Sequence, residues 1–276
     1  MVRFRIHALF AAFAIASPLR AETLEVRDDR LFVEAQIDGV SVMALLDSGA
    51  EVTILDRDFA ERLNTGKGEA VEARGTGKER VHAQLIQNLP FRVLGTSLTA
   101  PIAAIIDLSD VGSRLTGGPL PVILGREVFD AGRLSIDIQE GRIGWFEPAA
   151  IPPGVRLSLT AANGIESIPV QFGEVPVDAD FDLGNGSGLL VSPALAERLG
   201  LEAAGIEPGG GIGGAKGRAV VYVPELTFAG QSFRHVRAHI DDDARVDANI
   251  GVAQLRSFRI VTDFPGRAVW LDARND

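Results

Sequence analysis

The sequence predicts an all-β protein of two similar lobes, built by an internal duplication and containing only short helices. Apolar residues recur at every second position over much of the chain, which is typical of strands with one buried face. The 31 glycines and 14 prolines interrupt these stretches often, as turns between strands do. The two halves of the chain also repeat the same order of patterns at a nearly constant offset.

The repeat is clearest around two Asp-X-Gly motifs. Residues 40–46 alternate apolar side chains and lead into Asp47-Ser48-Gly49, and residues 175–181 lead in the same way into Asp182-Leu183-Gly184. The strands and the aspartates share one offset, since 175 − 40 and 182 − 47 both equal 135. Each half therefore predicts a strand that ends in a turn carrying an aspartate, where glycine permits a tight backbone.

The repeat continues beyond the aspartates with a second shared element. The tetrapeptide Ala-Glu-Arg-Leu occurs at residues 60–63 and again at 196–199, and each copy predicts a short helix. The second copy has a start signal, with Ser192 as N-cap and Pro193 as the first helical residue.

Each half then ends on a strand that runs into a glycine. Residues 122–125 match residues 248–251, and an aspartate follows each glycine after twelve residues, since 125 + 12 = 137 and 251 + 12 = 263. Asp137 and Asp263 are interpreted as structural or surface residues. The proline-rich stretch 148–153 predicts the boundary, so residues 22–150 form the N-terminal lobe and residues 151–276 the C-terminal lobe.

The first residues predict an export signal. Arg3 and Arg5 precede an apolar run at 8–17 that is too short to span a bilayer, and Ala21 is a small residue suited to cleavage. We expect residues 1–21 to be a signal peptide and the mature protein to be periplasmic or secreted, with no stable membrane insertion. An uncleaved membrane anchor is the alternative.

Composition excludes several classes of function. The formal net charge is −10 and no Lys/Arg run follows the first residues, so we expect no nucleic-acid partner. The chain has no cysteine, which excludes a thiol nucleophile, a cysteine-ligated zinc and disulfides. Residues 209–214 fit Gly-X-Gly-X-X-Gly, but a strand-like stretch follows them where a dinucleotide site needs a helix.

Two further groups of residues are weighed as metal sites and rejected. His235 and His239 alternate with apolar residues as on a strand, where four positions span roughly 13 Å, too far for one metal. We interpret both as surface histidines. The acidic run 241–243 lacks the glycine and glutamate of a calcium loop and predicts a solvated turn. We therefore expect neither a metal nor a cofactor.

Residues 44–55 (ALLDSGAEVTIL) and 122–129 (VILGREVF) resemble the retropepsin-like and pepsin-like aspartic peptidases. The resemblance implies an acid-protease fold, a catalytic dyad of Asp47 and Asp182 around one water, and cleavage of peptide bonds in a peptide or protein substrate. It also implies that Gly49 and Gly184 donate N–H groups to the carboxylates. The Ser48 hydroxyl would then hydrogen-bond to the opposite loop.

The chemistry explains why such a site needs two copies of the motif. Peptide hydrolysis without a covalent intermediate needs one group to activate water and one to protonate the carbonyl oxygen. Two adjacent carboxyls cannot both ionise easily, so the pair holds one proton over a range of pH. A duplicated lobe supplies this pair within one chain, and we expect a monomer.

Two features shape the expected cleft. Leu183 stands in the second half where Ser48 stands in the first, and it cannot make the same hydrogen bond, although Asn185 and Ser187 offer polar groups nearby. Two glycine-rich turns are candidate flaps over the substrate, and their key residues are Gly75, Thr76, Gly77, Gly211 and Gly213.

Three alternatives stay open. The first is a catalytically impaired, peptide-binding pseudopeptidase, which Leu183 favours. The second is a dimer that pairs the Asp47 residues of two first lobes. The third is an envelope interaction protein that kept only the fold.

Overall fold

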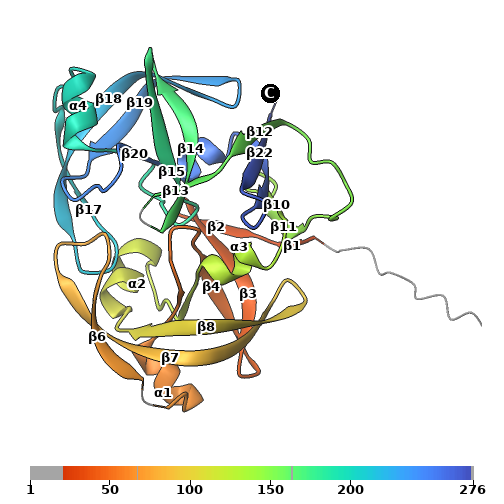
Figure 1. The fold of residues 1–276 in the computed structure, drawn as a ribbon. Helices are drawn as coiled ribbons and strands as arrows, with labels where there is room; N and C mark the ends of the chain where they lie inside the picture. Colours follow the sequence, from red (N-terminus) through yellow and green to blue (C-terminus); the bar gives the residue numbers. More distant parts are fainter. Residues whose placement is uncertain (1–20, 67, 163, 275–276) are drawn as a thin grey trace, which may run out of the picture.

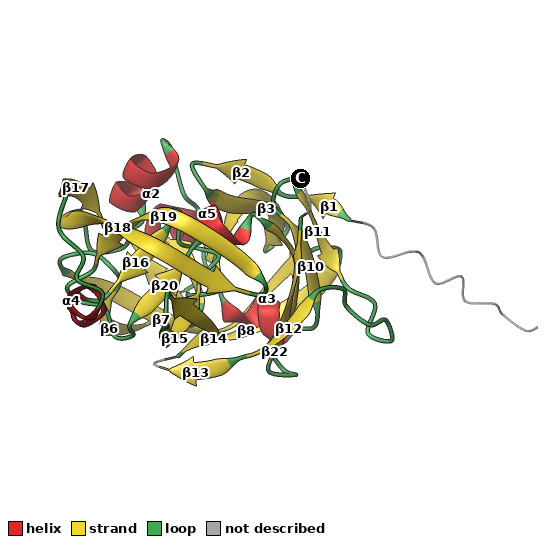
Figure 2. Cartoon of the chain, turned by 90° about the horizontal axis from the view of Figure 1, so that it is seen from above, coloured by secondary structure: helices red, strands yellow, loops and turns green. Residues whose placement is uncertain are grey.

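The computed structural model describes residues 21–66, 68–162 and 164–274. The predicted signal peptide, residues 1–21, lies outside the described residues except for Ala21. Figure 1 shows two bodies of strands, one above the other, joined at one side by a third sheet. Figure 2 shows that strands dominate and that the helices are short. The prediction of a two-lobed, all-β fold is confirmed.

The first lobe is an eight-stranded sheet in the order β2-β3-β4-β9-β5-β8-β7-β6, and an additional pairing of β3 with β7 curls it toward closure. Its strands are β2 (Glu25–Arg27), β3 (Arg30–Ile37), β4 (Val40–Leu46), β5 (Thr53–Asp56), β6 (Glu69–Arg74), β7 (Arg80–Val93), β8 (Thr96–Ile106) and β9 (Val122–Leu124). Its helices are α1 (Arg57–Leu63), α2 (Ser109–Thr116) and α3 (Arg126–Asp130).

The second lobe repeats the first strand by strand, in the order β13-β14-β15-β20-β16-β19-β18-β17 with an additional β14–β18 pairing. Its strands are β13 (Thr160–Ala162), β14 (Ile165–Phe172), β15 (Val175–Phe181), β16 (Leu189–Val191), β17 (Gly205–Gly209), β18 (Lys216–Phe228), β19 (Gln231–Ile240) and β20 (Ala248–Ile250). Its helices are α4 (Pro193–Arg198) and α5 (Val252–Leu255).

The third sheet joins the lobes in the order β1-β11-β10-β21-β22-β12. It contains β1 (Glu22–Thr23), β10 (Leu134–Asp137), β11 (Arg142–Trp145), β12 (Val155–Ser158), β21 (Phe258–Asp263) and β22 (Ala268–Ala273). At its centre Ser135 pairs with Val261. These two residues are 126 apart, which is also the offset between Gly125 and Gly251, so each residue faces its own counterpart. The pseudo-two-fold axis of the duplication therefore passes through this pair.

Local sequence explains the ends of the short elements. The Ser192 hydroxyl accepts the Leu195 N–H at 3.0 Å and begins α4, as predicted, and Asp56 caps α1 in the same way. Asp137 and Asp263 each accept a backbone N–H of the following turn, from Glu140 and Gly266 respectively. Both aspartates are therefore structural turn residues.

One expectation about surface residues is wrong and another holds only in part. His239 is only 8% exposed, although the sequence suggested a surface histidine. In the predicted solvated turn 241–243, Asp242 and Asp243 are exposed, but Asp241 is only 7% exposed. His239 lies on β19 with its side chain on the covered face, and Asp241 forms an ion pair with buried Arg218 at 3.0 Å. The strand prediction for this segment is correct, and His235 is exposed.

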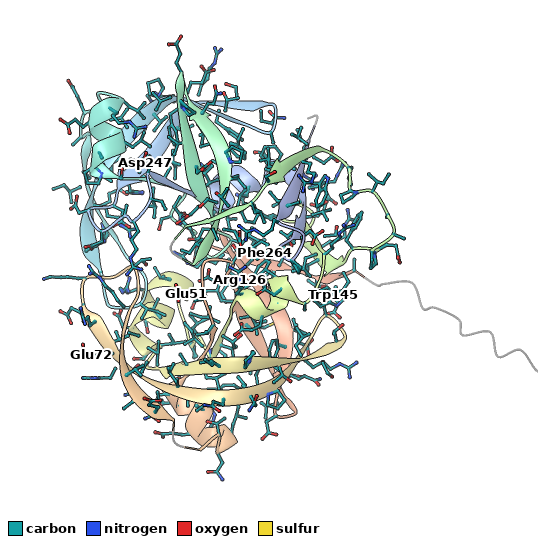
Figure 3. The ribbon with its side chains drawn as sticks, in the orientation of Figure 1. Glu51, Glu72, Arg126, Trp145, Asp247 and Phe264 are labelled. Atoms are coloured by element: carbon teal, nitrogen blue, oxygen red, sulfur yellow. The ribbon has the colours of Figure 1, made fainter. Side chains whose placement is uncertain are left out.

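The lobes also contact each other through side chains near the third sheet. The rings of Phe129 in α3 and Phe264 after β21 stack with centroids 5.0 Å apart, and Arg126 lies over Phe264 (Figure 3). Arg126 also donates at 2.7 Å to Glu166 in β14, and Arg267 donates to the same oxygen. Glu166 is fully buried, so two arginines compensate one carboxylate between the lobes.

None of the helices in the described part of the chain is long and apolar enough to cross a membrane.

We expect Glu166→Gln to lower the free energy of unfolding by about 2 kcal/mol, because two charge-assisted hydrogen bonds lose their ionised acceptor. Urea unfolding followed by circular dichroism measures this. Glu174→Gln, at an exposed turn position, is the matched control and should change little. Equal stabilities of the two variants would contradict a clamping role for Glu166.

Candidate active site

The two predicted aspartates lie on equivalent turns where each lobe pairs two strands in parallel. Asp47 follows β4, and its N–H donates to the Leu124 carbonyl of β9 at 3.0 Å. Asp182 follows β15, and its N–H donates to the Ile250 carbonyl of β20 at 3.1 Å. Each turn is thus anchored to the strand that runs into Gly125 or Gly251.

The structure brings these two turns into contact across the lobe interface. A Cβ atom placed on Gly184 would lie 2.1 Å from Cγ of Asp47, and one on Gly49 would lie 3.0 Å from Oδ1 of Asp182. Only glycine fits at position 184, because any side chain there would displace the opposite carboxyl. Each turn therefore lies against the carboxyl group of the other, and the two predicted aspartates meet.

Backbone N–H groups orient each carboxyl within its own turn. The Gly49 N–H donates to Oδ1 of Asp47 at 2.8 Å, and the Gly184 N–H donates to Oδ1 of Asp182 at 2.9 Å. These are the donors that the resemblance implied. Because each bond stabilises the ionised form, both oppose the effect of burial.

Ser48 bridges the two turns through its side-chain hydroxyl. Its hydroxyl donates to the Phe181 carbonyl and accepts the Leu183 N–H, both at 2.9 Å, across the lobe interface. Leu183 has its side chain in the core with no exposed surface and makes no reciprocal bond. One hydroxyl therefore satisfies two backbone groups of the opposite turn. The side-chain bridge between the turns comes from the first lobe and has no counterpart from the second.

Asn249 is a site residue that the sequence interpretation missed. Its amide donates to Oδ2 of Asp182 at 2.8 Å and is held in place by the Asn185 amide, which donates to Oδ1 of Asn249 at 2.7 Å. The counterpart of Asn249 in the first lobe is Ile123, which cannot donate. The available signal was an amide in Ala-Asn-Ile-Gly where the first half has Val-Ile-Leu-Gly.

The electrostatics of the pair are unequal. Burial, followed by the charge of Asp182, raises the pKa of Asp47 to about 7. Burial also raises the pKa of Asp182, but the Asn249 amide and two backbone N–H groups favour its ionised form. The Asn249 amide therefore favours the ionised form of Asp182 and the protonated form of Asp47 within the pair.

The candidate flaps are the tips of the β6–β7 and β17–β18 hairpins, which meet at the left of Figure 1. The Gly77 N–H donates to Ile212 at 2.9 Å, and the Glu79 N–H donates to Gly213 at 2.8 Å. The Gly211 N–H donates to the Thr76 hydroxyl at 2.9 Å. Gly75 also lies against this contact, since a Cβ there would be 2.5 Å from the Ile212 carbonyl oxygen.

Comparison with known proteins finds a family match within the first lobe. Residues 33–128 match the model of a family described as aspartyl protease, a stretch that includes Asp47 and the Val-Ile-Leu-Gly strand. This lobe resembles an aspartyl protease. The match supports a protease-like fold for this lobe.

One protein is similar to the chain over a longer stretch than the family model. DNA damage-inducible protein 1 of Yarrowia lipolytica is 22% identical over 166 residues, which is 59% of this chain. The matched stretch is 36% of that protein, so the chain spans about a third of the length of this relative.

The raised pKa of Asp47 predicts a pH effect on stability. Between about pH 4 and 7 the folded state keeps a proton that the unfolded state releases, so stability falls as the pH rises through this window. Asp47→Asn removes this penalty. We expect the variant to gain on the order of 2 kcal/mol over the wild type from pH 4 to pH 7, a value discounted because the carboxyl keeps some solvent contact.

Thermal or urea unfolding at both pH values measures the difference. Contributions of groups remote from the carboxyl pair are common to both proteins and cancel, and the measured difference belongs to the pair as a unit. A constant difference between variant and wild type across the window would contradict the raised pKa.

Proposed function

We propose that this protein is an aspartic endopeptidase, in which a water activated between Asp47 and Asp182 hydrolyses peptide bonds. The contact of the two half-buried aspartates at the lobe interface, where a Cβ on Gly184 would lie 2.1 Å from Cγ of Asp47, carries this proposal. Such a pair supplies an acid and a base in the same place.

The asymmetry of the pair supports a division of roles. Ionised Asp182, held by Asn249, accepts a proton from the water as the water oxygen attacks the scissile carbonyl carbon. Protonated Asp47 gives its proton to the carbonyl oxygen, which forms a neutral tetrahedral diol. The C–N bond then breaks as the amine nitrogen takes a proton from Asp182, and the diol returns one to Asp47. The starting state is restored without a cofactor.

The flaps support an extended substrate that lies between the lobes. The two hairpin tips are joined by only a few hydrogen bonds, and those between Gly77, Glu79 and the opposite tip are made by the backbone. These bonds would break as a peptide enters and re-form over it. A segment closed in this way also excludes water other than the reacting one.

Leu183 favours the competing pseudopeptidase interpretation, since the second lobe lacks a hydroxyl at this position. The structure weakens this argument, because Ser48 already satisfies both the Phe181 carbonyl and the Leu183 N–H. Both carboxyls come from one chain, which supports a monomer rather than a dimer of first lobes.

We expect Asp47→Asn and Asp182→Asn each to lower peptide cleavage by at least about 10³-fold, because each removes one of two groups that act as a unit. A peptide-library digest read by mass spectrometry measures this. Asp178→Asn, at an exposed aspartate of β15, is the matched control and should cleave normally. A folded dyad variant with wild-type cleavage would refute the proposed mechanism.

We propose further that the protein is exported and cleaved after Ala21, on the strength of the basic and apolar pattern of its first residues. Expression of the full chain in a bacterium, fractionation and N-terminal sequencing test this. We expect a periplasmic product that begins at Glu22. Retention of residues 1–21 in a membrane fraction would support the uncleaved anchor instead.

A further inference from the structure

The two lobes present chemically different faces beside the aspartates. In the first lobe one row of paired residues crosses the sheet from β3 to β8, namely Phe32, Leu45, Ile123, Ile54 and Ala104. All of these side chains are apolar and buried together. Ile212, from the tip of the opposite flap, packs against them. This apolar face therefore lies beneath a flap.

The equivalent row of the second lobe crosses from β14 to β19, namely Ser167, Asp180, Asn249, Leu190 and His239. The register is the same, because Asp180 pairs with Asn249 as Leu45 pairs with Ile123. Four of five apolar positions have become polar. Since Asn249 contacts Asp182 directly, this row leads up to the carboxyl pair.

Asp180 is the unusual member of this polar row. It precedes Asp182 by two residues on β15, so both side chains project to the same side of the sheet. It is only 6% exposed and accepts a hydrogen bond from the Ser167 hydroxyl at 2.9 Å. Asp180 takes part in none of the ion pairs between described residues. Burial, opposed by the Ser167 bond, and the charge of Asp182 raise its pKa to about 7.

Two cations of β18 pair with acidic side chains of the connection between β19 and β20. Arg218 pairs with Asp241 at 3.0 Å, and Lys216 pairs with both Asp241 and Asp243. The carboxyl pair holds a negative charge beside the row, and Asp180, with its pKa of about 7, adds a second one as it ionises. A cation bound here would favour the ionised form of Asp180.

Two buried nitrogen atoms, one in this row and one on the neighbouring strand β18, lack hydrogen-bond partners among the described residues. Nδ1 of His239 and Nε of Arg218 are enclosed and make no hydrogen bond to the described residues. Arg218 also reaches the first flap, where its guanidinium donates to the Thr76 carbonyl at 3.4 Å. Arg218, on the strand paired with that of His239, thus contacts the first flap, as Ile212 of the second flap contacts the apolar face.

The lobes also differ in what covers each face. In the first lobe, 15 residues (107–121) connect β8 to β9 and include α2, whose Val111 joins the apolar group. In the second lobe, only 7 residues (241–247) connect β19 to β20, and they form no helix. The second lobe therefore has no helix equivalent to α2 in the connection beside its polar row.

We propose that the cleft selects peptides with an apolar side chain on one side of the scissile bond and a lysine or arginine on the other. The apolar side chain contacts the Leu45–Ile123 face, and the basic one extends along the second-lobe row to Asp180. This inference rests on the proposed peptidase function and names its substrate class. Asp180 acts as a specificity-determining residue.

The test begins with a digest of a peptide library by the wild-type chain. We expect sites with an apolar residue on one side and Lys or Arg on the other. Two peptides built on the best site, differing only in Lys or Leu at the basic position, then give a kcat/KM ratio. Asp180→Leu, which installs the residue found at the equivalent position 45 of the first lobe, should lower the Lys-to-Leu ratio at least tenfold. Asp180→Asn keeps the size and shape of the side chain but removes its charge, and it should also lower this ratio.

Asp178→Leu, two residues earlier on β15 and exposed, is the matched control and should leave the ratio unchanged. A wild-type digest without preference for basic residues would overturn the inference. An Asp180 variant that keeps the wild-type ratio would also overturn the inference. The Asp180–Ser167 hydrogen bond would then serve only to join two strands.

A binding experiment separates this inference from the peptidase proposal. The same library is selected on immobilised wild-type and Asp180→Leu chains, and bound peptides are sequenced by mass spectrometry. If nothing is cleaved but Lys and Arg are enriched on the wild type alone, the peptidase proposal fails and the specificity inference stands. Equal composition of the peptides bound to both chains would overturn the inference whatever the turnover.

Discussion

Two carboxyl groups held in contact at a lobe interface are the constraint on which this structure depends. Like charges in a desolvated site repel, so the contact persists only if one proton is retained and the flanking structure resists separation. The β10–β21 pairing, the Phe129–Phe264 stack and the clamp of Glu166 between two arginines supply that resistance away from the site. Ser48 supplies it beside the carboxyls, through two hydrogen bonds to the opposite turn.

The pseudo-symmetry of the fold makes the departures from symmetry informative. A symmetric pair would leave the shared proton equally distributed, but Asn249 donates to Asp182 alone and directs the proton to Asp47. Leu183 removes one of two possible brackets, and the remaining hydroxyl serves both backbone groups. The duplication therefore supplied the geometry of the pair, and later divergence assigned different roles to its members.

The same divergence extends along the cleft. Positions that are apolar in the first lobe carry Ser167, Asp180 and His239 in the second, without any change in strand order or register. Burial of these groups is costly in the absence of partners. Their retention on the face that leads to the carboxyl pair is consistent with a polar ligand there rather than with packing.

The sequence by itself determined the duplication, the strand-rich class, the two aspartate turns and the helix start at Ser192, because periodicity and turn or cap residues act over a few neighbours. It misjudged His239 and Asp241, whose burial depends on the strands and flap that cover them. It also passed over Asn249 and Asp180, which stand 67 and 2 residues from Asp182 in the chain and read there as ordinary polar residues of a strand.

Only the tertiary structure decided that Asp47 meets Asp182, that Ser48 bridges both turns, and that the flap tips touch. These contacts join residues more than 130 positions apart, and no local pattern fixes which face of one lobe meets the other. The pKa values follow the same logic, because burial and the charge of a distant partner arise from packing and not from the neighbours of an aspartate along the chain.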